Sequence, residues 1–266
     1  MANLNGYSPI PAGATVGGAP IDAFLVDSLR SNDVFFEKML QAMLASPWMP
    51  SGTDTPDEIA DPDPRKFVNA KRIVVNTQIT LTQKVPLVWF AREKITLKHE
   101  IIATAKGADK GETGDFGGGG GWGGADGPDC KFPVSGVEIC KGGRSASKNG
   151  ADLPAVWASR ALSVLALCKG GAGGNSGGAT GSKGGGVVFL CAPEIIFEGA
   201  NAKIAANGEP AHTGSNGGGG GGGLVVLIGR RISGAVKNTN ITVTAGAKDN
   251  TGGNGGKGAI IIREIK

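Results

Sequence analysis

The sequence predicts a mainly β fold: a β-solenoid or stacked β-layers with glycine-rich, polyglycine II-like segments, plus a short N-terminal helical anchor. Three observations predict it, namely the glycine distribution, recurring apolar runs of strand length, and a regular step between those runs. Of the 266 residues 48 are glycine, and all but five of these glycines follow residue 106. This shift in composition divides the chain into residues 1–66, 67–106 and 107–266.

The N-terminal part, residues 1–66, is predicted to form an arm and one helix. Residues 1–20 are rich in Pro, Gly and Ala, and this composition predicts an extended arm. In residues 21–45 the apolar side chains of Phe36, Leu40 and Met43 recur at helical spacing. Their shared face is either an internal core or a docking surface for another protein. We favour docking, because little else in residues 1–66 could cover this face.

Two kinds of strand are predicted after residue 66. Runs that are apolar throughout are typical of strands buried on both faces, and alternating runs are typical of half-buried strands. The apolar runs are Leu87–Phe90, Val187–Leu190, Leu224–Ile228 and Ala259–Ile262. The alternating runs are Ile79–Thr82, Ile95–Lys98 and Ile241–Thr244.

The two kinds of strand follow each other in degenerate repeats. Each repeat reads as a buried strand, a turn, an alternating strand and a glycine-rich excursion. The step is 37 residues from Gly186 to Gly223 and 35 residues from Gly223 to Gly258. Repeats that cannot bury their own apolar face must stack on their neighbours, which predicts the layered body.

The glycine runs have two interpretations, flexible linkers or ordered backbone packing. The last three runs each lead directly into a predicted strand. Extended polyglycine with three residues per turn can pack side by side, because glycine has no Cβ and its N–H and Cα–H groups can reach neighbouring carbonyls. We favour ordered packing.

Composition excludes several classes of protein. The net charge is +4 without a basic cluster, which argues against a nucleic-acid partner. No secretory signal begins the chain, so we expect synthesis in the cytoplasm and reduced thiols. No C-x-x-C pair or other ligand spacing predicts a metal or cofactor, and Lys257 stands where a calcium nonapeptide repeat has a liganding Asp. The pairing of the four cysteines cannot be deduced; they are Cys130, Cys140, Cys168 and Cys191.

The apolar module KVPLVWFAREKITLKHEIIATAKG and the glycine-rich segments after it carry a family resemblance. Over roughly residues 67–266 the chain resembles the detachable receptor-binding adhesins at the tail-fibre tips of T-even-type bacteriophages, and glycine-rich phage fibre proteins more generally. It departs from them in having fewer and shorter glycine runs, more Val and Ile, and little Tyr.

The resemblance implies a non-enzymatic virion protein whose N-terminal part docks on a fibre and whose polyglycine helices display loops to the host. The implied partners are other virion proteins of the fibre, tail or capsid, and a host surface protein or glycan. Fibre proteins are often homotrimers, whereas a tip adhesin can be a single copy. On this interpretation Phe36, Leu40 and Met43 are the virion-docking candidates.

Three aromatic residues in or beside the first glycine run, Phe116, Trp122 and Phe132, are candidates for receptor binding. Aromatic side chains give a large contact area at a low entropy cost and are favoured at binding hot spots. The alternative is that they cap the end of the β body.

Two other functions compete with host recognition. One is a structural head-fibre, decoration or baseplate protein that makes no receptor contact. The other, less favoured, is a surface-glycan hydrolase that uses Asp126 and Asp129 as paired carboxylates. These residues flank Gly127-Pro128, which is also the composition of a solvated turn. No Ser/His/Asp set is evident, and we expect no enzyme.

Overall fold

The structure is a computed structural model that describes residues 56–66, 68–81, 86–106, 129–131, 138–143, 149–153, 182–212 and 217–265. All of these residues belong to one compact unit, Asp54–Lys266. The described part is mainly β, its two larger sheets are parallel, and no helix occurs in it. The predicted helix with Phe36, Leu40 and Met43 and the aromatic candidates Phe116, Trp122 and Phe132 lie outside the described residues.

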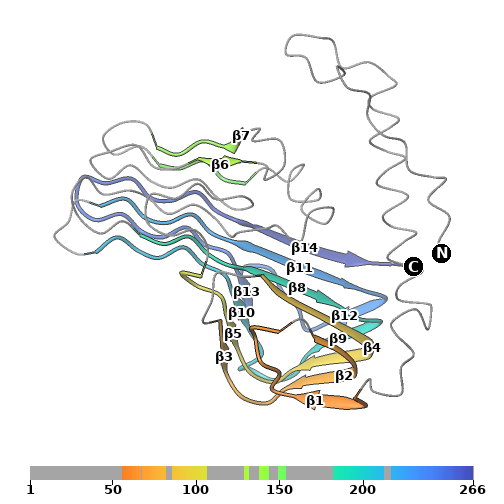
Figure 1. The fold of residues 1–266 in the computed structure, drawn as a ribbon. Helices are drawn as coiled ribbons and strands as arrows, with labels where there is room; N and C mark the ends of the chain where they lie inside the picture. Colours follow the sequence, from red (N-terminus) through yellow and green to blue (C-terminus); the bar gives the residue numbers. More distant parts are fainter. Residues whose placement is uncertain are drawn as a thin grey trace, which may run out of the picture. The chain divides into compact units, whose positions relative to one another are not determined.

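The main sheet is a parallel stack whose strands follow one another in chain order, although strands of the other sheets intervene along the chain (Figure 1). Its order is β1 (Glu58–Ala60), β2 (Val68–Val75), β4 (Leu87–Leu97), β8 (Val187–Cys191), β11 (Leu224–Gly229) and β14 (Ala259–Glu264). Two further strands extend it: β9 (Glu194–Phe197) pairs with the second half of β4, and β12 (Arg231–Ser233) pairs with β9.

A minor parallel sheet runs beside the main one, and a third pair of strands is antiparallel. The minor sheet consists of two-residue strands in the order β13 (Ile241–Thr242), β10 (Ile204–Ala205), β5 (Ile101–Ile102) and β3 (Ile79–Thr80). The antiparallel pair is β6 (Cys130–Lys131) with β7 (Glu138–Cys140).

The strand register reproduces the repeat step that the sequence predicts. Leu224 pairs with Val187, 37 residues earlier, and with Ala259, 35 residues later. Ile204 pairs with Ile241, again 37 residues on. The repeats therefore lie directly above one another, with equivalent residues in contact.

The core lies between the main and minor sheets. Side chains of one face of the main sheet, such as Trp89, Leu190 and Leu227, are fully buried there with Ile101 and Ile204 of the minor sheet. The opposite face of the main sheet is also apolar: Phe90 and Phe189 are buried, and their ring centroids lie 5.5 Å apart. Strands buried on both faces explain why these runs are apolar without alternation.

One of the four apolar runs is not buried as predicted. Ala259–Ile262 forms β14, whose residues are all half-buried up to Arg263. The reason is its position, because β14 pairs only with β11 at the end of the described stack. Only Ile260 and Ile262 pack against the core.

The alternating runs also differ from the prediction. Ile95–Leu97 is not a separate strand after a turn, because Leu87–Leu97 is one continuous strand. The runs at Ile79 and Ile241 form only two-residue strands and lie in the minor sheet. The predicted turn does occur in the next repeat, where Pro193, which has no N–H, separates β8 from β9 and its carbonyl accepts hydrogen bonds from the N–H groups of Arg230 and Arg231.

Strands from both sides of Gly107 share the two sheets. Trp89 pairs with Leu190 in the main sheet, and Ile101 pairs with Ile204 in the minor sheet. The described strands thus resume the stack at β8, and 84 residues separate the end of β5 from the start of β8. The division at residue 107 marks a change in composition along the chain, while the described strands on its two sides are hydrogen-bonded together.

Candidate functional site

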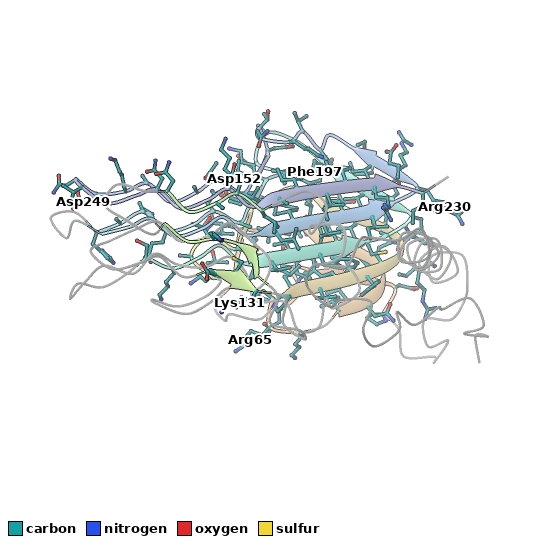
Figure 2. All side chains as sticks on the ribbon, turned by 90° about the horizontal axis from the view of Figure 1, so that it is seen from above. Arg65, Lys131, Asp152, Phe197, Arg230 and Asp249 are labelled. Atoms are coloured by element: carbon teal, nitrogen blue, oxygen red, sulfur yellow. The ribbon has the colours of Figure 1, made fainter. Side chains whose placement is uncertain are left out.

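Glycine-rich segments run side by side beyond the sheets (Figure 1). Segments 206–211 and 243–249 follow strands of the minor sheet, and segments 182–186, 217–223 and 252–258 lead into strands of the main sheet. We call the described segments together the glycine bundle; they are residues 149–153, 182–186, 206–211, 217–223, 243–249 and 252–258. Figure 2 shows Asp249 at the far end of this region and Asp152 along it, while Phe197 and Arg230 lie with the sheets.

Segment 217–223 is buried along its whole length and donates hydrogen bonds with a three-residue period. The N–H groups of Gly219 and Gly222 reach the carbonyls of Gly253 and Gly256, at 3.0 and 2.9 Å. The N–H groups of Gly220 and Gly223 reach the carbonyls of Glu209 and Ala206, at 2.9 and 2.7 Å. Residues three apart therefore donate to the same neighbouring segment, and successive residues donate to different segments.

The carbonyls of segment 217–223 follow the same rule. Those of Gly217 and Gly220 accept from the N–H groups of Asp249 and Gly246. Those of Gly218 and Gly221 accept from the Ser182 hydroxyl and the Gly185 N–H. Segment 217–223 thus has four neighbours, of which 182–186 and 252–258 run parallel to it and 206–211 and 243–249 run antiparallel. A β-strand, with its period of two, cannot bond in this way.

The bundle has no room for side chains at the interior positions that glycine occupies. A Cβ atom built on Gly222 would collide with the carbonyl oxygen of Val243, and one built on Gly255 would collide with that of Gly220. These obstacles are backbone atoms, which cannot rotate away as a side chain can. The glycines are required here by close approach of neighbouring backbones.

Non-glycine residues at the edge of the bundle cap backbone N–H groups. The Asn149 and Asp152 Oδ1 atoms accept from the N–H groups of Asn254 and Lys257, at 2.9 and 2.7 Å. The Asn207 Oδ1 accepts from the Thr244 N–H at 2.8 Å. Asn149 and Asp152 are three residues apart, and so are Asn254 and Lys257, so one edge of each segment carries the caps.

A groove of about 510 Å³ opens on this edge. The groove lies between segments 149–153 and 243–249, over residues 254–257, and all of its lining residues are small or polar. They are Asn149, Gly150, Asp152, Thr244, Ala245, Gly246, Ala247, Asn254, Gly255 and Lys257. Sequence reasoning missed this groove, although the three-residue spacing of Asn149 with Asp152 and of Asn254 with Lys257 was a usable signal.

Few of the residues singled out from the sequence meet in the structure. One Asp129 carboxylate oxygen accepts a hydrogen bond from the Gly142 N–H at 2.9 Å; its proposed partner Asp126 lies outside the described residues. In the backbone register of β6 with β7, Cys130 lies opposite Cys140, and Cys130 is buried. Cys191 is a buried thiol in β8, and its desolvation raises its pKa to about 12. Cys168 lies outside the described residues.

Two further features are absent from the described ranges. These ranges hold no group of three or more His, Cys, Asp or Glu residues placed to bind a metal ion. In the same part of the chain no helix has the length and apolar character needed to cross a bilayer.

No family model, curated protein or solved structure matches this chain.

Proposed function

We propose that this chain is a bacteriophage virion structural protein, a tail-fibre or fibre-tip protein that recognises the host surface. The observation that carries the proposal is the three-residue period of hydrogen bonds in the glycine bundle. That period is expected of polyglycine II helices, the packing that the resemblance to tail-fibre tip adhesins implies for the glycine-rich part.

The finer fold belongs to the same proposal. The parallel strands, spaced by 37 and 35 residues, are the rungs of a β-solenoid, and the glycine bundle extends its wall as packed polyglycine II helices. The main and minor sheets share the same 37-residue register step. This supports the interpretation, because each turn of a solenoid places its residues above the equivalent residues of the previous turn in every sheet.

This architecture suits a projecting protein. Segment 217–223 of the bundle is held by hydrogen bonds to four neighbouring segments, so loops at the end of the bundle are presented from a rigid support, where little ordering entropy remains to be lost on binding. The aromatic candidates Phe116, Trp122 and Phe132 then supply contacts to the host. Residues Phe36, Leu40 and Met43 supply the attachment to other virion proteins, and several copies per particle raise the avidity.

Two measurements test this function. Antibodies against the chain, bound to particles from infected cultures and imaged by electron microscopy, should label the fibre or its end. The purified chain should compete with those particles for adsorption to host cells. Label on the head or baseplate without competition would assign the structural alternative, and absence of label would refute a virion protein.

The anchor and receptor residues can be tested in the same particles. Replacing Phe36, Leu40 and Met43 together by Ser should remove the protein from the particle and leave the circular dichroism of its β structure unchanged. Replacing Trp122 by Ala should leave incorporation intact and lower the adsorption rate. Cleavage of host polysaccharide that is lost in Asp129→Asn would instead favour the hydrolase.

A further inference from the structure

We propose that the groove on the glycine bundle binds a neutral, hydroxyl-rich saccharide. The source of the saccharide, a glycan of the host surface, rests on the proposed function, whereas its chemistry is argued from the groove alone.

The groove is the size of a small-ligand site and is built from rigid parts. Its volume of about 510 Å³ falls within the range of about 300–1,000 Å³ found for ligand pockets. The Gly255 N–H donates to the Gly246 carbonyl at 3.1 Å, and the Gly150 N–H donates to the Asn254 carbonyl at 2.9 Å. These bonds tie the floor to both walls, so the groove is preformed for its ligand.

The backbone beneath the groove is closely packed against the rest of the bundle. Gly150, Gly246 and Gly255 are all buried, and a Cβ on Gly246 or Gly255 would collide with backbone carbonyls. The side chains that rise around this floor are Asn149, Asp152, Thr244 and Lys257, all of them exposed. A ligand in the groove therefore meets a backbone that is held in place and polar side chains around it.

Many polar groups in the groove have no partner among the described residues. The Asn149 and Asp152 Oδ1 atoms cap backbone N–H groups, and this fixes both side chains while the Asn149 amide nitrogen and the second Asp152 oxygen have no hydrogen bond. The Thr244 hydroxyl, the Lys257 ammonium and the backbone N–H groups of Ala245 and Ala247 also make none. The edge thus offers both donors and acceptors.

That mixture fits hydroxyl groups. A sugar hydroxyl donates one hydrogen bond and accepts others, so adjacent hydroxyls require neighbouring donors and acceptors, which Lys257 and Asp152 provide. The charges of these two residues cancel within the lining, so the groove has no net charge to select a polyanion. It has no large apolar side chain either, which disfavours a lipid or an apolar peptide.

The test uses the full chain and an array of neutral oligosaccharides from bacterial surface polysaccharides. We expect at least one oligosaccharide to bind. In a titration of the ¹⁵N-labelled protein with that oligosaccharide, the amide signals of Ala245, Ala247 and Gly255 should shift. Lys257→Met and Thr244→Val should each weaken binding at least tenfold.

The matched control is Lys248→Met. Lys248 is exposed and lies near the groove without lining it, so its replacement removes the same charge elsewhere on the bundle and should leave binding unchanged. Absence of binding to every neutral oligosaccharide at millimolar concentration would overturn the proposal. So would equal affinity in Lys257→Met, Thr244→Val and the parent protein.

The adsorption assay separates this proposal from the proposed function. If Lys257→Met and Thr244→Val compete for adsorption as well as the parent protein, the groove is not the host-binding site and the virion function stands. If the groove binds a saccharide but the chain neither labels particles nor competes for adsorption, the virion function fails and the saccharide site stands.

Discussion

The sheets and the glycine bundle are ordered by opposite means. In the sheets, side chains such as Trp89, Leu190 and Leu227 fill the space between two layers, and hydrophobic burial holds the strands. In the bundle, glycine occupies most of the interior positions and the backbones themselves are in contact, held by hydrogen bonds to several neighbours.

This difference sets which substitutions each region tolerates. The sheets lose stability when a side chain is made smaller, because a cavity remains. The bundle loses stability when a side chain is added, because the adjacent backbone cannot move aside. A substitution to alanine therefore removes core packing in strand β11, which begins at Leu224, and adds a clashing methyl group in segment 217–223, which ends at Gly223.

The largest effect should come from truncation in the sheet core. Leu227→Ala removes a fully buried side chain and should lower the free energy of unfolding by about 4 kcal/mol. Ile262→Ala, at the half-buried edge strand β14, should cost about half as much. Urea unfolding followed by circular dichroism measures both, and equal losses would contradict the assignment of β14 to the edge.

A slightly smaller effect should come from adding one methyl group to the bundle. Gly222→Ala should lower the free energy of unfolding by about 3 kcal/mol, because the new Cβ collides with the Val243 carbonyl. Gly199→Ala is the matched control: its φ of 86° strains alanine by about 1 kcal/mol, but its surroundings are open. A neutral Gly222→Ala in the same urea experiment would show that the bundle is loosely packed.

Alkaline pH should weaken the sheet region through Cys191. Burial raises the pKa of this thiol from 9.0 to about 12, so the unfolded chain loses the proton first as the pH rises. The stability linked to Cys191 is complete below pH 9 and is lost progressively above it, by on the order of 1 kcal/mol at pH 10. Thermal unfolding at pH 8 and pH 10 should show a smaller alkaline loss in Cys191→Ala than in the parent protein, and identical losses would exclude a buried thiol.

The smallest effect should come from the caps at the edge of the bundle. Asp152→Ala removes the acceptor for the Lys257 N–H and should cost about 0.5–1 kcal/mol. Asp152→Asn keeps a side-chain oxygen in that place and should be close to neutral. Denaturant melts of the two variants measure the difference, and an equal loss in both would mean that charge, and not the cap, stabilises this edge.

The sequence predicted the local features of the fold better than its connections. The apolar runs at Leu87, Val187 and Leu224 are buried strands, and the step of 37 residues appears as the register of β8 with β11. The segment from Val85 to Gly107 reads as a further copy of the repeat, but the next copy begins far beyond a step of 35–37 residues, so the spacing did not indicate that Trp89 pairs with Leu190.

The candidate site was predicted only in part. A high glycine content indicates close backbone packing, but it does not say which segments are neighbours. The bond from the Asn254 N–H to Asn149 spans 105 residues, and only the fold reveals it. The half-buried state of β14 was missed for a similar reason, because Ala259–Ile262 looks like a central strand until its neighbours are known.

Amide hydrogen exchange of residues 217–223 tests the central claim, that these glycines form an ordered, hydrogen-bonded bundle, most directly. The amides of Gly219, Gly220, Gly222 and Gly223 all donate to carbonyls at 3.0 Å or less, so we expect protection close to that of strand β11 next to them. Exchange of these four amides at the rate of an unfolded chain, with β11 still protected, would contradict it.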